Sequence, residues 1–135
     1  MGNPGLNIAS AIKVVGMGAM NIDHLYCVER ILLDGEAPVE GFELCPGGSA
    51  ANTIYGLAKL GVRTGFLGIV GEDEVGGKLI KSFASVSVDT SQVRVKKGAK
   101  TGSVLCLSDK RGRRSLYVLP GANSGKDAVD QPNSS

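Results

Sequence analysis

Two polar side chains, Asn21 and Asp23, stand where a short apolar segment ends. If the chain stays extended there, residues two apart point to the same side. A carboxylate accepts hydrogen bonds from hydroxyl groups, and an amide both donates and accepts them. The pair therefore suits a polyhydroxy ligand. Asn and Asp are also common in the turns that end strands, so spacing alone leaves both interpretations open.

A second candidate is the segment Gly47-Gly48-Ser49-Ala50-Ala51-Asn52, which leads into a run with helical spacing. Two glycines allow a ligand to approach the backbone closely, and the start of a helix presents free N–H groups. Asn52 would lie in the first turn and face the same ligand. The alternative is an ordinary glycine-rich turn in which the Ser49 hydroxyl caps the helix.

Two nucleotide-binding motifs fail on spacing. Gly16-Met17-Gly18 follows an apolar segment, but a dinucleotide fingerprint needs a third glycine where Asn21 stands, and the next segment is predicted to be extended. A dinucleotide-dependent oxidoreductase is therefore the least favoured hypothesis. In residues 71–78, a phosphate loop would need Lys where Gly77 stands, so none is predicted.

Composition and charge exclude several classes of protein. The 135 residues fit one domain, and 42% hydrophobic with 21% charged residues is a globular balance. A formal net charge of +2 argues against nucleic acid as a partner. No apolar run approaches the roughly 20 residues of a membrane helix, and the first residues lack the pattern of a secretory signal. We therefore expect a cytoplasmic protein.

The three cysteines, Cys27, Cys45 and Cys106, form no Cys-x-x-Cys pair, and the chain has one histidine. That leaves little for a zinc site, so no metal site is predicted. Because free cysteine is often a core residue, we interpret all three as buried thiols in a reducing cytoplasm.

Hydrophobic periodicity predicts alternating strands and helices up to about residue 85. Strands are expected at 12–20, 24–28, 37–44 and 62–70. A helix should follow the Gly47 segment and stop at Gly61, and a second should begin after the acidic residues 72–74. Together they predict a parallel sheet with covering helices.

The pattern changes after residue 90. Residues 92–95, 101–107 and 115–119 are predicted strands, and 108–112 is a hairpin turn. The hairpin strands predict a second, smaller sheet attached to the first.

Taken in order, these segments resemble the PfkB-type carbohydrate kinases, the ribokinase-like family. The likeness covers about residues 12–125. The motifs that carry it are residues 18–23, 46–52, 56–61, 68–73, 101–102 and 121–123, together with Gly76.

The resemblance implies an α/β fold class, the N-terminal part of a ribokinase-like fold, in which a parallel sheet with covering helices carries a small β lid. Residues 12–125 would form an incomplete domain between an N-terminal tail at 1–11 and a polar tail at 126–135. The lid strands would be those near 24–28, 37–44 and 101–119.

The resemblance also implies where a sugar or nucleoside would bind, between the lid and the sheet. The substrate-binding residues would be Asn21, Asp23, Gly47, Gly48, Asn52 and, lining the pocket, Val104. Ser49 departs from ribokinase itself, where Lys is usual, and this leaves nucleosides open besides sugars. A homodimer through the lid is implied as well.

Two motifs of the family do not occur in the 135 residues. They are Gly-Ala-Gly-Asp, whose Asp is the family's catalytic base, and Asn-x-x-Glu, which is tied to magnesium and phosphate. We therefore predict no catalytic residue in this chain, ATP and Mg²⁺ as cofactors of the parent enzyme only, and no activity of the chain alone. The alternative is a non-catalytic sugar- or nucleoside-binding or dimerisation module.

Overall fold

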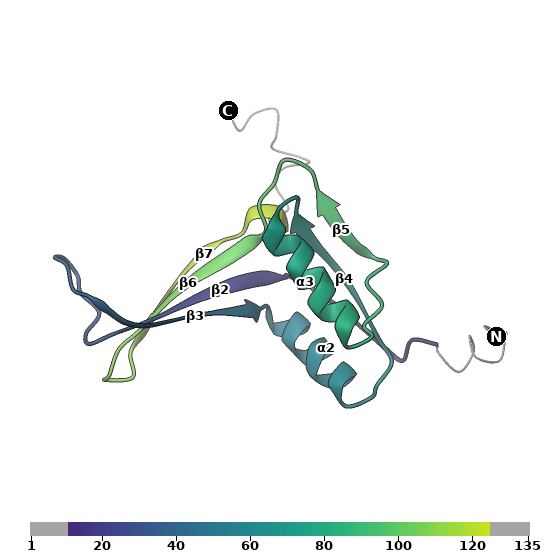
Figure 1. Ribbon diagram of the computed structural model, residues 1–135, viewed down its shortest axis with the longest axis horizontal. Helices are drawn as coiled ribbons and strands as arrows, with labels where there is room; N and C mark the ends of the chain where they lie inside the picture. Colours follow the sequence, from purple (N-terminus) through teal and green to yellow (C-terminus); the bar gives the residue numbers. More distant parts are fainter. Residues whose placement is uncertain (1–10, 125–135) are drawn as a thin grey trace.

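The computed structural model of this chain describes residues 11–124, which form two sheets and two helices. The first sheet is parallel, with strand order β1-β4-β5: β1 (Val14–Met17), β4 (Thr64–Gly71) and β5 (Val93–Lys96). Helices α2 (Ser49–Lys59) and α3 (Glu74–Ser85) lie side by side over one of its faces (Figure 1). Residues 1–10 and 125–135 lie outside the described part, so the predicted tail boundaries stay predictions.

The second sheet has four strands in the order β3-β2-β6-β7, and we call it the lid sheet. Its strands are β2 (Asn21–Val28), β3 (Val39–Gly47), β6 (Gly102–Ser108) and β7 (Arg114–Leu119). β2 runs antiparallel to β3 and parallel to β6, and β6 and β7 form a hairpin. The lid sheet extends beyond the helices on the left of Figure 1. The predicted fold class, a parallel sheet with covering helices plus a small β lid, is confirmed.

The hydrophobic core lies between the parallel sheet and the two helices. Phe66 and Val70 on β4 are buried against Ile54 of α2 and against Leu79 and Phe83 of α3. Phe66 and Phe83 meet edge to face, with ring centroids 5.3 Å apart, an arrangement that aromatic pairs favour. The four-residue spacing of Leu79 and Phe83 places both on the helix face that meets the sheet.

The prediction of a buried strand over residues 12–20 is wrong in length and in burial. β1 covers four residues at one edge of the sheet, and its side chains alternate between the two faces. Gly16 faces α2, because a Cβ there would collide with Ile54. Val15 and Met17 point the other way and are 55% and 75% exposed, because no helix among residues 11–124 covers that face.

Glycine and aspartate shape the helix ends. α2 ends as predicted, with Leu60 as its C-cap and Gly61 at φ 93°. The N-cap of α2 is Gly48, and Ser49 is the first helical residue, so the alternative in which the Ser49 hydroxyl caps the helix does not hold. α3 begins after Asp73, whose side chain accepts a hydrogen bond from the Gly76 N–H, as the acidic run predicted.

The lid strands are longer than predicted. β2 begins at Asn21 and β3 continues to Gly47, so the polar candidates lie within strands rather than beyond them. The hairpin turn at 108–112 is confirmed, and the Asp109 carboxylate accepts backbone N–H groups of Arg111 and Arg113 there.

The predicted strand at 92–95 is confirmed as β5, and it pairs with β4 in the parallel sheet. One further prediction needs correction. The interpretation of three buried thiols holds only for Cys106, because Cys27 is exposed and Cys45 is partly exposed. Both lie on lid strands, which have water on their faces.

Candidate functional site

Asn21 and Asp23 open the central strand of the lid sheet. Met20, just before them, is buried in the core of the parallel sheet, so the two polar residues stand where the chain passes from one sheet to the other. They are two apart on β2, which places their side chains on one face. The structure thus shows the extended geometry on which the sequence argument depended.

The Asp23 carboxylate lies against the backbone at the end of β3. A Cβ on Gly47 would collide with it, so a larger residue at that position would displace the carboxylate. Asp23 pairs in register with Cys45 on one side and with Val104 on the other. Val104 is partly buried, and it presents an apolar surface next to the carboxylate on the same face of the lid.

One oxygen of Asp23 has no partner. Oδ1 is buried, and no hydrogen bond reaches it from residues 11–124. Burial raises the pKa of Asp23, and the nearby His24 opposes that shift in part. A buried carboxylate oxygen without a hydrogen-bond donor raises the free energy of the folded chain. Asp23 Oδ1 can therefore accept a hydrogen bond from a bound molecule.

Asn21 has a partner that sequence reasoning did not assign. The Asn123 side-chain amide donates to Asn21 Oδ1 at 2.8 Å and to the Met20 carbonyl at 3.3 Å. With its oxygen engaged, Asn21 has its NH₂ group left to donate to a ligand. Asn123 closes the short helix η1 (Gly121–Asn123). Its place in a Gly-Ala-Asn motif was the signal that could have found it.

The glycine pair lets parts of this chain approach one another closely, and its contact with a ligand stays a prediction. Gly47 ends β3, and Gly48 has φ 108°, a conformation that favours glycine. A Cβ on Gly48 would also collide with the Ala19 carbonyl. The backbone therefore passes close to the residue that precedes β2 at this point, and α2 begins directly after it.

Asn52 is the predicted site residue that stands apart. It lies in the first turn of α2 with an exposed side chain. It lines a cavity of about 230 Å³ between α2 and α3, to which Gly47 and Tyr55 also contribute. Within residues 11–124 its side chain makes no hydrogen bond to Asn21 or Asp23, so the structure does not join it directly to the carboxylate.

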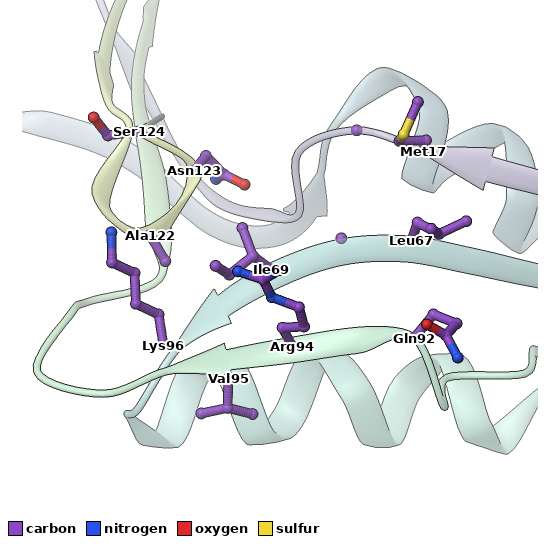
Figure 2. A pocket seen from close by; sticks show the side chains of 12 residues that line it. Met17, Leu67, Ile69, Gln92, Arg94, Val95, Lys96, Ala122, Asn123 and Ser124 are labelled. Carbon is purple, nitrogen blue, oxygen red and sulfur yellow. The ribbon is translucent and has the colours of Figure 1, made fainter. Parts of the chain in front are cut away.

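A larger hollow of about 620 Å³ lies on the bare face of the parallel sheet. Figure 2 shows Leu67, Ile69 and Arg94 lining it, with Asn123 at its upper rim. It is shallow and lacks the Asp23 carboxylate. We therefore place the candidate site at Asp23 and Gly47. Asn123 lines the hollow and bonds to Asn21, so it connects the hollow to the candidate site.

Several other features bear on function. Among the described residues no group of three or more His, Cys, Asp or Glu could hold a metal ion, and none of the described helices has the length and apolar character needed to cross a membrane. Gly18 is followed within three residues by strand β2 rather than by a helix, so the segment lacks the helix start that a dinucleotide site requires.

The sequence matches the model of the pfkB family carbohydrate kinases over residues 11–134. It is 32% identical to a ribokinase of Staphylococcus aureus (strain COL) over 113 residues, which cover 82% of this chain and 37% of the relative. It is 34% identical to a fructokinase of Klebsiella pneumoniae over 107 residues, covering 78% and 34%.

Solved structures agree with these relatives. An Arabidopsis thaliana ribokinase, whose structure is described as complexed with ribose and ATP, superimposes with a TM-score of 0.72 at 31% identity. The match covers 84% of this chain and 37% of that one. The chain therefore spans about a third of the length of these three proteins.

Proposed function

Because this chain belongs to the pfkB family of carbohydrate kinases, we propose that it is the substrate-binding part of an ATP-dependent kinase that phosphorylates a hydroxyl group of a sugar or nucleoside. The observation that carries the proposal is the unpartnered Oδ1 of Asp23. A hydroxyl group of a polyol would donate to that oxygen and remove the cost of its burial.

The neighbouring groups complete a site for a polyol. The Asn21 NH₂ group donates to a second hydroxyl. The absence of side chains at Gly47 and Gly48 lets the Asp23 carboxylate and the Ala19 carbonyl lie against this backbone, which holds the carboxylate in place for the ligand. Val104 covers an apolar face of the ligand. The names of the relatives, ribokinase and fructokinase, favour a sugar, whereas Ser49 in the same motif leaves a nucleoside open.

Phosphoryl transfer needs a positioned nucleotide, charge stabilisation and a group that receives the hydroxyl proton. We assign none of these to this chain, because its sequence lacks both family motifs that supply them. Residues 11–124 also offer no acidic cluster that fits Mg²⁺. We therefore place ATP and Mg²⁺ in the parent enzyme, and we expect the 135-residue chain to bind its substrate without phosphorylating it.

A second candidate function is a binding or dimerisation module without chemistry. The lid sheet favours it, because apolar side chains are exposed on both of its faces. They include Phe42, Leu44 and Leu105 on one face and Leu116 and Val118 on the other. A second copy of the chain would remove one such face from water, and a homodimer through the lid is our proposal for the assembly.

Isothermal titration of the purified chain with ribose, fructose and adenosine tests the proposal. We expect one of them to bind, and we expect Asp23→Asn to weaken that binding at least about tenfold, because it replaces a charged acceptor. Asp34→Asn, in the exposed loop before β3, is the matched control and should bind as the wild type does.

Equal affinity in the Asp23 and Asp34 variants would show that the site is misplaced. Addition of ATP and Mg²⁺ provides a separate test of the chemistry. Turnover by the 135-residue chain would contradict its assignment as a part that only binds. Light scattering at several protein concentrations tests the homodimer, and a monomer at all of them would remove that proposal.

A further inference from the structure

The segment that connects β5 to the lid strand β6 is held by the carboxylate of Asp73, the N-cap residue of α3. Asp73 Oδ1 accepts a hydrogen bond from the Thr101 hydroxyl at 2.6 Å, and Oδ2 accepts one from the Thr101 backbone N–H at 2.8 Å. The Thr101 oxygen in turn accepts the Gly71 N–H at 3.0 Å. Three hydrogen bonds thus converge on one buried residue, where the chain leaves the parallel sheet for the lid.

The packing around these bonds leaves no free space. A Cβ on Gly76 would lie 2.6 Å from the Gly71 carbonyl oxygen and 2.8 Å from the Thr101 hydroxyl. A Cβ on Gly71 would collide with the backbone of residues 99–101. The end of β4, the start of α3 and the segment before β6 are therefore in van der Waals contact, and Thr101 cannot shift without moving one of them.

Thr101 is one residue away from the candidate site. Gly102 begins β6 and pairs in register with Asn21. A Cβ on Gly102 would collide with the Asn123 amide and would lie 2.6 Å from Asn21 Oδ1. Because these groups touch, the position of Thr101 determines where Gly102 lies, and Gly102 limits where the Asn21 and Asn123 amides can lie.

We propose that Asp73 is a positioning residue for substrate binding: together with Thr101 it forms an anchor that fixes the root of β6 against Asn21. Asp73 touches no ligand in this arrangement and acts through Thr101 and Gly102. The inference depends on the proposed function, because the effect of the anchor on affinity is measured with the substrate. Its effect on the geometry of Asn21 is measured without it.

The electrostatics of Asp73 agree with this role. Burial opposes ionisation, but the hydrogen bonds from Thr101 and Gly76 outweigh it and lower the pKa of Asp73 below its ordinary value. The carboxylate is therefore ionised at neutral pH, and both of its oxygens act as acceptors, as the anchor requires.

Two substitutions separate the anchor from the cap of α3. Asp73→Asn keeps a good N-cap, but its amide has one acceptor oxygen and turns an NH₂ group toward one of the two Thr101 donors. Thr101→Val removes the hydroxyl at nearly constant shape, and Thr101→Ser restores it. The matched control is Asp109→Asn, since Asp109 also accepts backbone N–H groups but lies at the far tip of the lid.

The experiment combines titration of the chain with ribose and fructose with hydrogen exchange followed by mass spectrometry. We expect Asp73→Asn and Thr101→Val to weaken sugar binding about tenfold, as loss of a buried hydrogen bond would. Exchange should become faster at residues 21–23 and 101–104. Thr101→Ser should restore both readouts. Asp109→Asn should speed exchange only at Ile31 and residues 109–113, whose N–H groups lie at its carboxylate, and should leave affinity unchanged.

Wild-type affinity together with unchanged exchange at residues 21–23 in both anchor variants would overturn the inference. So would equal losses of affinity in Asp109→Asn, because that would indicate a general loosening of the lid. If circular dichroism shows that Thr101→Val does not fold, the sugar affinity and hydrogen exchange of Asp73→Asn, compared with those of Thr101→Ser, decide whether the inference holds. If the wild-type chain binds neither sugar and no nucleoside, the proposed function fails, and exchange at residues 21–23 alone decides whether the anchor exists.

Discussion

The parallel sheet and the lid sheet remove very different amounts of apolar surface from water. On β4, Phe66 and Val70 are 1% and 0% exposed beneath the two helices. On the four lid strands described here, Cys106 is the one residue with a side chain that is buried, whereas Phe42 is 55% exposed. Burial therefore stabilises the parallel sheet, whereas the lid depends on its backbone ladders and on the contacts at its root.

That difference explains where the candidate site lies. The substrate candidates Asn21, Asp23 and Gly47 are at the root of the lid, close to the rigid core, and not along its exposed length. A site at the lid root has the packed core of the parallel sheet on one side and the lid strands on the other. We expect the lid side to open more easily, since elements with few buried contacts do so. The following substitutions test this contrast, beginning with the largest expected effect.

Two phenylalanines compare the sheets directly. Phe66→Ala should lower the free energy of unfolding by about 3–5 kcal/mol, because it leaves a cavity in a closed core. Phe42→Ala removes the same atoms from the lid, where the ring centroids of Phe42 and Tyr26 are 4.8 Å apart and about half of Phe42 is exposed to water. This substitution should lower the free energy of unfolding by less than about 1 kcal/mol. Urea unfolding measures both, and similar losses would show that the lid has a core of its own.

Adjacent glycines on α3 test how tightly the helix start meets the lid root. Gly76→Ala should destabilise the chain by about 1–3 kcal/mol, because its Cβ would press on Gly71 and Thr101. Gly77→Ala meets no atom within 4 Å and should stabilise the helix by about 0.5–1 kcal/mol. Thermal unfolding followed by circular dichroism should show opposite shifts, and two shifts of the same sign would contradict the packing described here.

Acid should remove the contribution of Asp73 to stability. Its pKa in the folded chain is below the ordinary value of 3.8, so its contribution is complete above 3.8 and is lost as the pH falls through the lowered folded value. At neutral pH we expect Asp73→Asn to cost about 1 kcal/mol. Urea unfolding of both proteins from neutral to strongly acidic pH should show this difference shrinking, and a constant difference would contradict it.

Thiol labelling offers a test with no expected effect on stability. Cys27 is exposed and should react first. Cys45 should be slower, because burial, Glu43 and Asp23 all raise its pKa and less of the reactive thiolate is present. Cys106 is buried and should react only when the lid opens. Timed labelling with iodoacetamide and mass spectrometry gives the order, and early reaction of Cys106 would mean that the lid is loose even at its centre.

Local patterns were sufficient for much of the fold. Helix α2, its end at Gly61 and the turn at 108–112 depend on neighbours within a few residues, so periodicity and turn chemistry predicted them correctly. The ordered motifs were sufficient for the family, which the match to the family model over residues 11–134 confirms. The site residues carried over from the resemblance remain predictions, but Asn21, Asp23, Gly47 and Val104 do lie together at the lid root.

What the sequence determined by itself is thus the kind of each element and the family to which the chain belongs. Only the tertiary structure decided which sheet accepts β5 and that β1 stands at an edge with one face bare. It also decided that Asn123 bonds to Asn21 and Thr101 to Asp73, partners far away in the sequence. The physical reason is that edge position, burial and an orphaned oxygen such as Asp23 Oδ1 are properties of segments brought together by folding. No local pattern of residue types contains them.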